Sequence, residues 1–67
     1  MCQATVYLLR DGQKEEVMRD TTFLEVTDAG VRVATFFEEP RLLPARVAYV
    51  DFVKSVVGLV PFTEEGA

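Results

Sequence analysis

Residues 1–10, with the sequence MCQATVYLLR, predict the first β-strand, with which the rest of the fold is expected to pair. They also contain the only cysteine of the chain. The even positions are all apolar: Cys2, Ala4, Val6 and Leu8. The odd positions mix polar and apolar residues: Gln3, Thr5, Tyr7 and Leu9. An alternation of period two that includes Val, Thr and Tyr is typical of a strand. The even face is expected to contact the core, and the odd face is a candidate contact for another subunit.

Further extended segments follow at short intervals. Asp11-Gly12 is a strong hairpin signal, since glycine adopts positive φ without a steric cost. The alternation of apolar residues predicts strands at 16–19, 21–27, 31–37, 46–53 and 56–60. A short helix over 45–52 is the alternative for the fourth of these segments, but its valine and tyrosine content favours a strand.

Prolines divide the second half of the chain. Pro40 ends the strand that begins at Val31, because the residue before a proline is pushed out of helical space and proline donates no ladder hydrogen bond. Pro44 restricts residues 41–46 to an edge, a bulge or a sharp bend. Gly58 is expected to allow curvature or a close backbone approach. Pro61 should stop the last strand and leave residues 61–67 as a frayed tail.

These segments predict an all-β fold. Five or six short strands joined by tight turns, within a single domain over residues 1–67, fit a small SH3-like or Sm-like barrel. A chain of 67 residues buries only about 60% of its unfolded surface, so a monomer should be marginally stable. One cysteine cannot form an intrachain disulfide, which leaves a metal, a partner subunit or both as stabilising elements.

Charge and composition exclude several classes of protein. The formal net charge is −4 and the seven basic residues are scattered, which disfavours binding to nucleic acid. No apolar run approaches the roughly 20 residues that span a bilayer, and no secretion signal is visible. A lone thiol suits the reducing cytosol. We therefore expect a cytoplasmic protein that binds neither a membrane nor nucleic acid.

Cys2 is the candidate metal ligand. If Met1 is removed, the mature chain begins with a thiolate, a free amine and the following amide nitrogen, which can chelate one metal ion. Such N,S donors suit nickel(II) or copper(II), while the thiolate alone also suits zinc or copper(I). The chain has no histidine, so an ordinary Cys/His zinc site would lack ligands. On the residues alone, a small buried hydrophobe is the commoner role for a free cysteine.

Catalysis is not expected from this sequence. A nucleophilic cysteine needs a positioned base, normally histidine, and none is present. Adjacent carboxylates on a strand point to opposite faces and do not form an acid/base pair; these pairs are Glu15-Glu16, Glu38-Glu39 and Glu64-Glu65. They are better explained as solvated loop charges.

The aromatic residues permit two interpretations. Stacking of bases, as in single-strand binders, is one role for Phe36, Phe37, Tyr49 and Phe52. Core packing or a dimer contact is the commoner role in so small a domain, and few lysines or arginines lie between these aromatics.

The sequence resembles the CooT family, small accessory proteins of nickel insertion into carbon monoxide dehydrogenase. The likeness covers roughly residues 1–60, and Met1-Cys2 followed by the first strand is its most specific part. The other matching pieces are Asp11-Gly12, Glu15 to Met18, the region of Asp20, Gly30-Val31-Arg32 and Phe36-Phe37-Glu38.

The resemblance implies a homodimeric SH3- or Sm-like domain that binds nickel(II) through Cys2, with backbone nitrogens such as that of Gln3 as co-ligands. It also implies a nickel metallochaperone or sensor with a nickel-enzyme maturation partner, without naming the client. Two other functions stay open: a metal-free protein-interaction module and an Sm-like RNA-binding unit.

Overall fold

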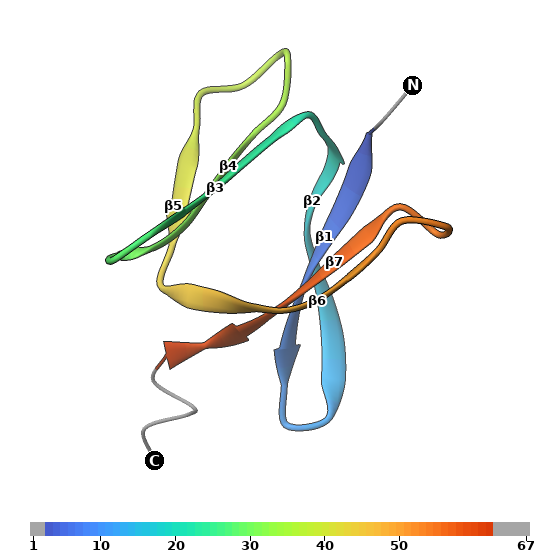
Figure 1. The fold of residues 1–67 in the computed structure, drawn as a ribbon, viewed down its shortest axis with the longest axis vertical. Coiled ribbons are helices and arrows are strands. Elements are labelled where there is room, and N and C mark those ends of the chain that lie inside the picture. Colours follow the sequence, from blue (N-terminus) through green and yellow to red (C-terminus); the bar gives the residue numbers. More distant parts are fainter. Residues whose placement is uncertain (1–2, 63–67) are drawn as a thin grey trace.

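The computed structural model describes residues 3–62, which form seven β-strands in two sheets (Figure 1). The strands are β1 (Ala4–Arg10), β2 (Gln13–Thr21), β3 (Phe23–Thr27), β4 (Gly30–Ala34), β5 (Arg41–Leu43), β6 (Ala45–Asp51) and β7 (Val56–Pro61). One sheet has the order β2-β1-β7-β6 and the other β3-β4-β5. Neighbouring strands are antiparallel, except that β1 and β7 are parallel. The prediction of an all-β fold is confirmed.

The predicted closed barrel is not found, because the strand ladders stop where the chain passes from one sheet to the other. The first passage is at Thr22, whose amide donates to the carbonyl of Ala34 at 2.9 Å. The second is at Pro44, which makes the bend that its lack of an N–H predicts. The total is seven rather than five or six, because residues 41–43, expected to form an edge, a bulge or a sharp bend, form the edge strand β5.

Two strands end earlier than their sequence pattern predicts. The hydroxyl of Thr35 accepts hydrogen bonds from the amides of Phe37 and Glu38, both at 3.1 Å, and this local turn replaces the ladder after Ala34. The carboxylate of Asp51 ends β6 in the same way, as described below. Serine, threonine and aspartate side chains that satisfy nearby amides compete with strand pairing, which the alternation of apolar residues does not reveal.

Irregular pairing bends the β1–β2 ladder. Val6 lies opposite Met18, while the next pairs on either side are Ala4 with Thr21 and Tyr7 with Glu16. Residues such as Val17 are thus left without a partner in the register, as in a β-bulge. The carbonyl of Val17 instead accepts a hydrogen bond of 3.2 Å from Nη1 of Arg41, which joins β2 to a strand of the other sheet.

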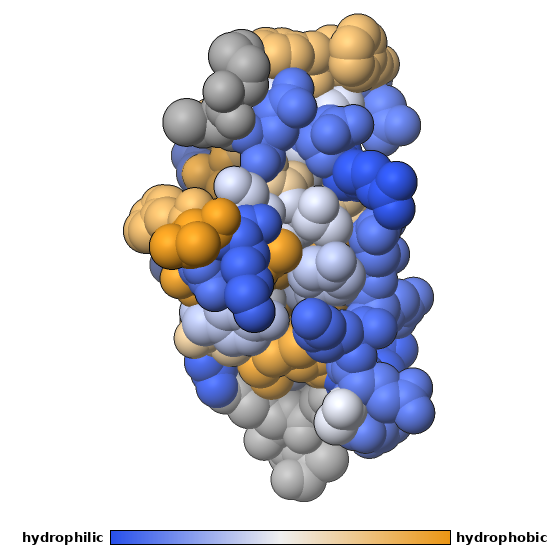
Figure 2. Space-filling model, turned by 90° about the vertical axis from the view of Figure 1, so that its right-hand side faces the viewer, coloured by the Kyte–Doolittle hydropathy of each residue, from blue (hydrophilic) through white to orange (hydrophobic). Residues whose placement is uncertain are grey.

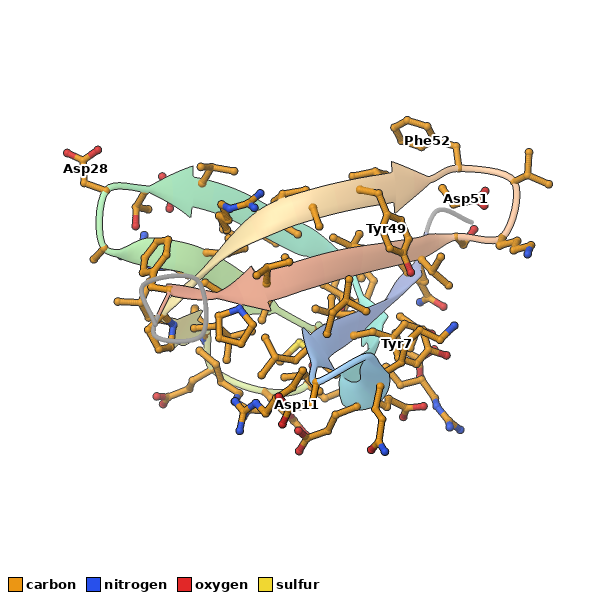
Figure 3. All side chains as sticks on the ribbon, turned by 90° about the horizontal axis from the view of Figure 1, so that it is seen from below. Tyr7, Asp11, Asp28, Tyr49, Asp51 and Phe52 are labelled. Atoms are coloured by element: carbon orange, nitrogen blue, oxygen red, sulfur yellow. The ribbon has the colours of Figure 1, made fainter. Side chains whose placement is uncertain are left out.

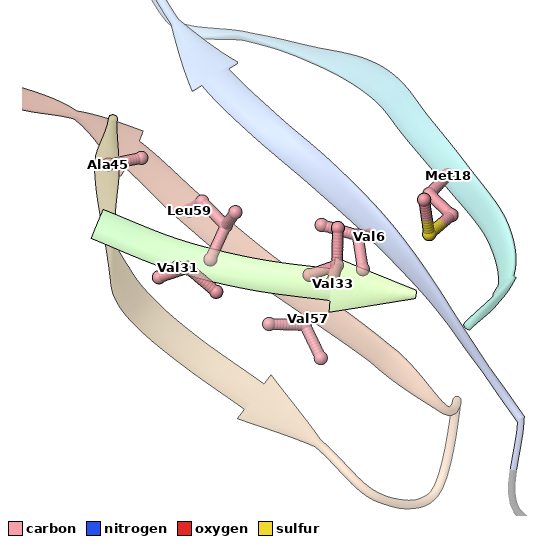
Figure 4. Close-up of a cluster of buried hydrophobic side chains, with 7 residues drawn as sticks. All are labelled: Val6, Met18, Val31, Val33, Ala45, Val57 and Leu59. Atoms are coloured by element: carbon pink, nitrogen blue, oxygen red, sulfur yellow. The ribbon is translucent and has the colours of Figure 1, made fainter. Parts of the chain in front are cut away.

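The core lies between the two sheets (Figure 4). Its fully or almost fully buried members are Val6, Met18, Val31, Val33, Ala45, Val57 and Leu59. Ala4 and Leu8 pack against this cluster from β1, so the predicted inward face of the first strand is confirmed for the even residues that the structure describes.

Two tyrosines cover the outer face of the four-stranded sheet (Figure 3). Gly58 is paired with Tyr7 on one side and with Tyr49 on the other. A Cβ atom at Gly58 would collide with the ring of Tyr49, so the expected close approach at this glycine is confirmed, and it is made by a side chain. The ammonium of Lys14 lies 4.7 Å from the ring centre of Tyr7.

Gly30 closes the turn between β3 and β4. Its φ of +143° is unfavourable for residues with a side chain, and a Cβ there would collide with the carbonyl of Leu43 on β5. The hydroxyl of Thr27 donates to the Gly30 carbonyl at 2.9 Å and accepts from the Ala29 amide at 3.2 Å.

Replacing Leu59 by Ala should lower the free energy of unfolding by about 2–5 kcal/mol, because it opens a cavity at a side chain with no exposed surface. The matched control Leu42→Ala, at a half-exposed leucine, should cost less than about 1 kcal/mol. Urea unfolding at one protein concentration, followed by circular dichroism, compares them; equal losses would contradict the assigned core.

Gly30→Ala should destabilise the fold more than Gly12→Ala. Both positions have positive φ, which costs a residue with a Cβ about 1–2 kcal/mol. Only at Gly30 does the added methyl also meet backbone, whereas nothing lies within 4 Å at Gly12. Thermal unfolding of the two variants provides the measurement, and a lower midpoint for Gly12→Ala would show that the close approach of β4 and β5 is wrong.

Candidate metal-binding end

The N-terminal segment is held at one end of the molecule. Gln3 is half-buried and directly precedes β1, whose pairing with β2 begins at Ala4. The amide of Thr5 donates a 3.0 Å hydrogen bond to the carbonyl of Ser55, which ties this end of β1 to the turn between β6 and β7. The hairpin between β1 and β2 lies at the opposite end (Figure 1). Cys2, the predicted thiolate ligand, lies outside the described residues.

The β6–β7 turn projects two large apolar side chains. One oxygen of Asp51 accepts hydrogen bonds from the amides of Val53 and Lys54, both at 3.0 Å, and Ser55 has a φ of +58°. Phe52 is 87% exposed and Val53 is 94% exposed. Phe52 extends from the turn away from the sheets (Figure 3). The turn is therefore ordered by its own aspartate, although its apolar tip has no cover within the described chain.

A pocket of about 390 Å³ separates this turn from the N-terminal segment. Its walls come from Gln3 and Ala4, from Leu24 of β3, and from the residues that end β6 and begin β7, including Val50 and Val57. Most of the lining is apolar, and Val57 belongs to the core. The pocket therefore exposes the edge of the core beside the start of β1. Sequence patterns did not reveal it, because it combines the N-terminal segment, β3 and the β6–β7 hairpin, which are far apart in the chain.

The described residues offer no preformed metal cage. Within residues 3–62, no three histidine, cysteine, aspartate or glutamate side chains come together. Asp51 lines the pocket, but one of its oxygens already accepts two amides. Gln3 lies outside the β1–β2 and β1–β7 ladders, so its backbone is not engaged in strand pairing. A metal ion at this end would need donors from the N-terminal residues themselves, which fits a backbone and thiolate set.

The paired carboxylates do not form a site. Glu15 and Glu16 are exposed on β2, and Glu16 forms a 3.1 Å ion pair with Arg19, whose pKa is raised by this hydrogen-bonded pairing. Glu38 and Glu39 are exposed in the loop between β4 and β5. Glu64 and Glu65 lie outside the described residues. These positions agree with solvated charges.

The four aromatics do not form one stacking platform. Phe36 and Phe37 are exposed on the loop after β4, Phe52 is on the β6–β7 turn, and Tyr49 covers Gly58 on a sheet face. Glutamates rather than basic residues follow Phe37, so this loop lacks the positive charge that attracts a phosphate backbone. No helix within residues 3–62 is long and apolar enough to cross a membrane.

Comparison with known proteins gives one family and one structural neighbour. The family model described as the CO dehydrogenase accessory protein CooT matches residues 1–59. A crystal structure described as CooT of Carboxydothermus hydrogenoformans superposes with a TM-score of 0.81, covering 90% of this chain and 97% of that chain. The two are 17% identical in sequence, so this superposition shows a shared fold. A search of curated proteins found no match.

The family match begins at the first residue and extends into β7, so it includes the N-terminal segment as well as the sheets behind it. Its description is of an accessory protein, which agrees with the expectation that the chain is not an enzyme. The chain belongs to the CooT family of CO dehydrogenase accessory proteins.

Proposed function

We propose that this protein is a cytoplasmic nickel(II)-binding metallochaperone or nickel sensor that acts in the maturation of a nickel enzyme. In this proposal a homodimer binds the ion as cargo through the thiolate of Cys2 and backbone nitrogens of the N-terminal residues, including that of Gln3. The observation that carries it is the family match, which includes residues 1–3 and describes an accessory protein of CO dehydrogenase.

Two properties of the described chain support N-terminal donors. The absence of histidine from the sequence, and of any cluster of carboxylates within residues 3–62, leaves the thiolate and backbone as the available strong ligands. In addition, the hydrogen bond from Thr5 to Ser55 holds the base of the N-terminal segment against the sheet. Strand pairing that begins at Ala4 therefore fixes the point where the N-terminal segment leaves the sheet.

The donor set also favours nickel over harder ions. Thiolate and nitrogen ligands suit square-planar nickel(II) or copper(II), while magnesium and calcium prefer oxygen. The thiol must lose its proton to bind, so affinity should rise with pH as the thiolate forms. CO dehydrogenase is the client that the family description suggests, and a different nickel enzyme would use the same chemistry.

Titration of nickel(II) into the untagged full chain tests the proposal. We expect stoichiometric binding with a thiolate-to-nickel absorption band, and Cys2→Ser should lose the band and weaken binding at least 100-fold. Gln3→Ser is the matched control, since only the backbone of Gln3 is proposed as a ligand, and it should bind nearly as tightly as the wild type.

Equal nickel affinity for Cys2→Ser and the wild type would contradict the proposal. Complete absence of nickel binding in the untagged wild type would favour the metal-free interaction module instead. Retention of single-stranded RNA that weakens steeply with salt would favour the RNA-binding unit.

A further inference from the structure

We infer that the β6–β7 turn and the pocket beside it form the contact between two copies of this chain, with Phe52 and Val53 of each copy seated in the pocket of the other. The inference specifies the surface of the homodimer and rests on the proposed function for the existence of that dimer. We call this surface, made of Phe52, Val53 and the pocket walls, the tip-and-pocket face.

The turn is preorganised for insertion. Asp51 fixes the amides of Val53 and Lys54, so the two apolar side chains project from a defined backbone. An exposed aromatic on an ordered turn loses little conformational entropy when it is covered. Large hydrophobic side chains exposed to this degree on a small domain commonly mark an interaction site.

The projecting side chains of the turn and the pocket lie side by side on the same copy. Phe52 and Ser55 of the turn line the pocket, and Leu24, Val50 and Val57 supply apolar lining. A twofold axis requires one patch to complement itself. A patch that contains both an apolar projection and an apolar recess satisfies this requirement, because each projection can enter the recess of the other copy. Figure 2 faces the side of the turn and shows hydrophobic surface at the left, at the height of the turn, separate from a second hydrophobic group at the top, where the β4–β5 loop lies.

Charge distinguishes this face from the exposed aromatic pair on the loop after β4. Phe36 and Phe37, on the loop after β4, are followed directly by exposed Glu38 and Glu39, so self-association there would bring four carboxylates of two acidic chains together. The carboxylate in the tip-and-pocket face is Asp51, which is engaged by amides and followed by Lys54. For a chain of net charge −4, the tip-and-pocket face is the less repulsive surface for a second copy.

The outer face of the four-stranded sheet is a weaker alternative, although the sequence makes Tyr7 a candidate contact. Tyr7 is half-buried beneath the ammonium of Lys14, and Tyr49 fills the space over Gly58. Both rings therefore already have partners within their own chain. Phe52 and Val53 have no such cover among the described residues.

The expected contact lies at the small end of the range for a specific dimer. An aromatic side chain buries roughly 150–250 Å² when fully covered, so two Phe52 rings alone account for about 300–500 Å². The two copies of Val53, Val50 and the pocket walls extend the area toward the roughly 1,000 Å² at which specific interfaces begin.

The arrangement would also bring the two N-terminal segments together. Gln3 lines the same pocket, so the inserted tip of one copy would contact the segment that carries the proposed ligands of the other. A single chain has one thiol and no histidine, and a second copy at this face would supply a second donor set. The dimer contact and the metal site are thus coupled, and loss of the dimer should weaken nickel binding.

Sedimentation of the untagged full chain over a micromolar concentration series tests the surface. Phe52→Ser should raise the dimer dissociation constant at least tenfold. Phe37→Ser is the matched control, because Phe37 is the same residue type with the same 87% exposure, and it should leave the constant unchanged. Val50→Lys, which places a charge in the pocket wall, should weaken the dimer like Phe52→Ser. Circular dichroism melts confirm that each variant folds.

Three results would overturn the inference: a wild-type monomer throughout the series, an unchanged constant for Phe52→Ser, or a loss with Phe37→Ser that equals or exceeds it. Cys2→Ser separates this inference from the proposed function. A Cys2→Ser variant that dimerises but binds no nickel supports the ligand, and dissociation of Phe52→Ser supports the face. Full nickel affinity in Cys2→Ser, with dissociation of Phe52→Ser, would reject the nickel proposal and retain the dimer face.

Discussion

The contact between β4 of one sheet and β1 and β7 of the other is the interaction on which the structure depends. Val31 and Val33 of β4 have no exposed surface, and neither do Val6 of β1 and Leu59 of β7. In a chain of 67 residues this small cluster supplies most of the apolar burial available to drive folding. Both sheets must therefore remain pressed together, and the chain passes between them at Thr22 and Pro44.

The same constraint leaves an open edge. The pocket beside Val57 opens at the edge between the start of β3 and the end of β6, with Leu24 and Val50 in its walls. Gln3 enters here, and the β6–β7 turn projects beside it. Gln3 and the turn residues Phe52 and Val53 can thus serve a function without disturbing the core, because none of the three belongs to the core cluster. A site assembled on an open edge can also recruit a second copy, which a closed barrel end would hinder.

Much of the sheet structure is predictable from local pattern. The inward face of β1, the turn at Asp11-Gly12 and the bend at Pro44 follow from period-two alternation and from the φ preferences of glycine and proline. Strand ends were less predictable. Thr35 and Asp51 end β4 and β6 through hydrogen bonds from side chain to backbone, and hydrophobic alternation through Phe37 and Val53 conceals them. Exposure of Phe37 and Phe52 follows from these turns.

The sequence by itself determined the all-β class, the polarity of the first strand and the family, since these depend on residue types at short spacing and on a recognisable N-terminal segment. By omitting histidine it also excluded an ordinary Cys/His zinc site. Only the tertiary structure decided that the ladders stop at two corners, that Tyr49 covers Gly58 and that Gln3, Leu24 and Val50 line one pocket. The physical reason is that the corners and the pocket depend on how the two sheets pack, which is set by contacts between residues far apart in the chain, while the pairing of Tyr49 with Gly58 depends on the register of β6 and β7.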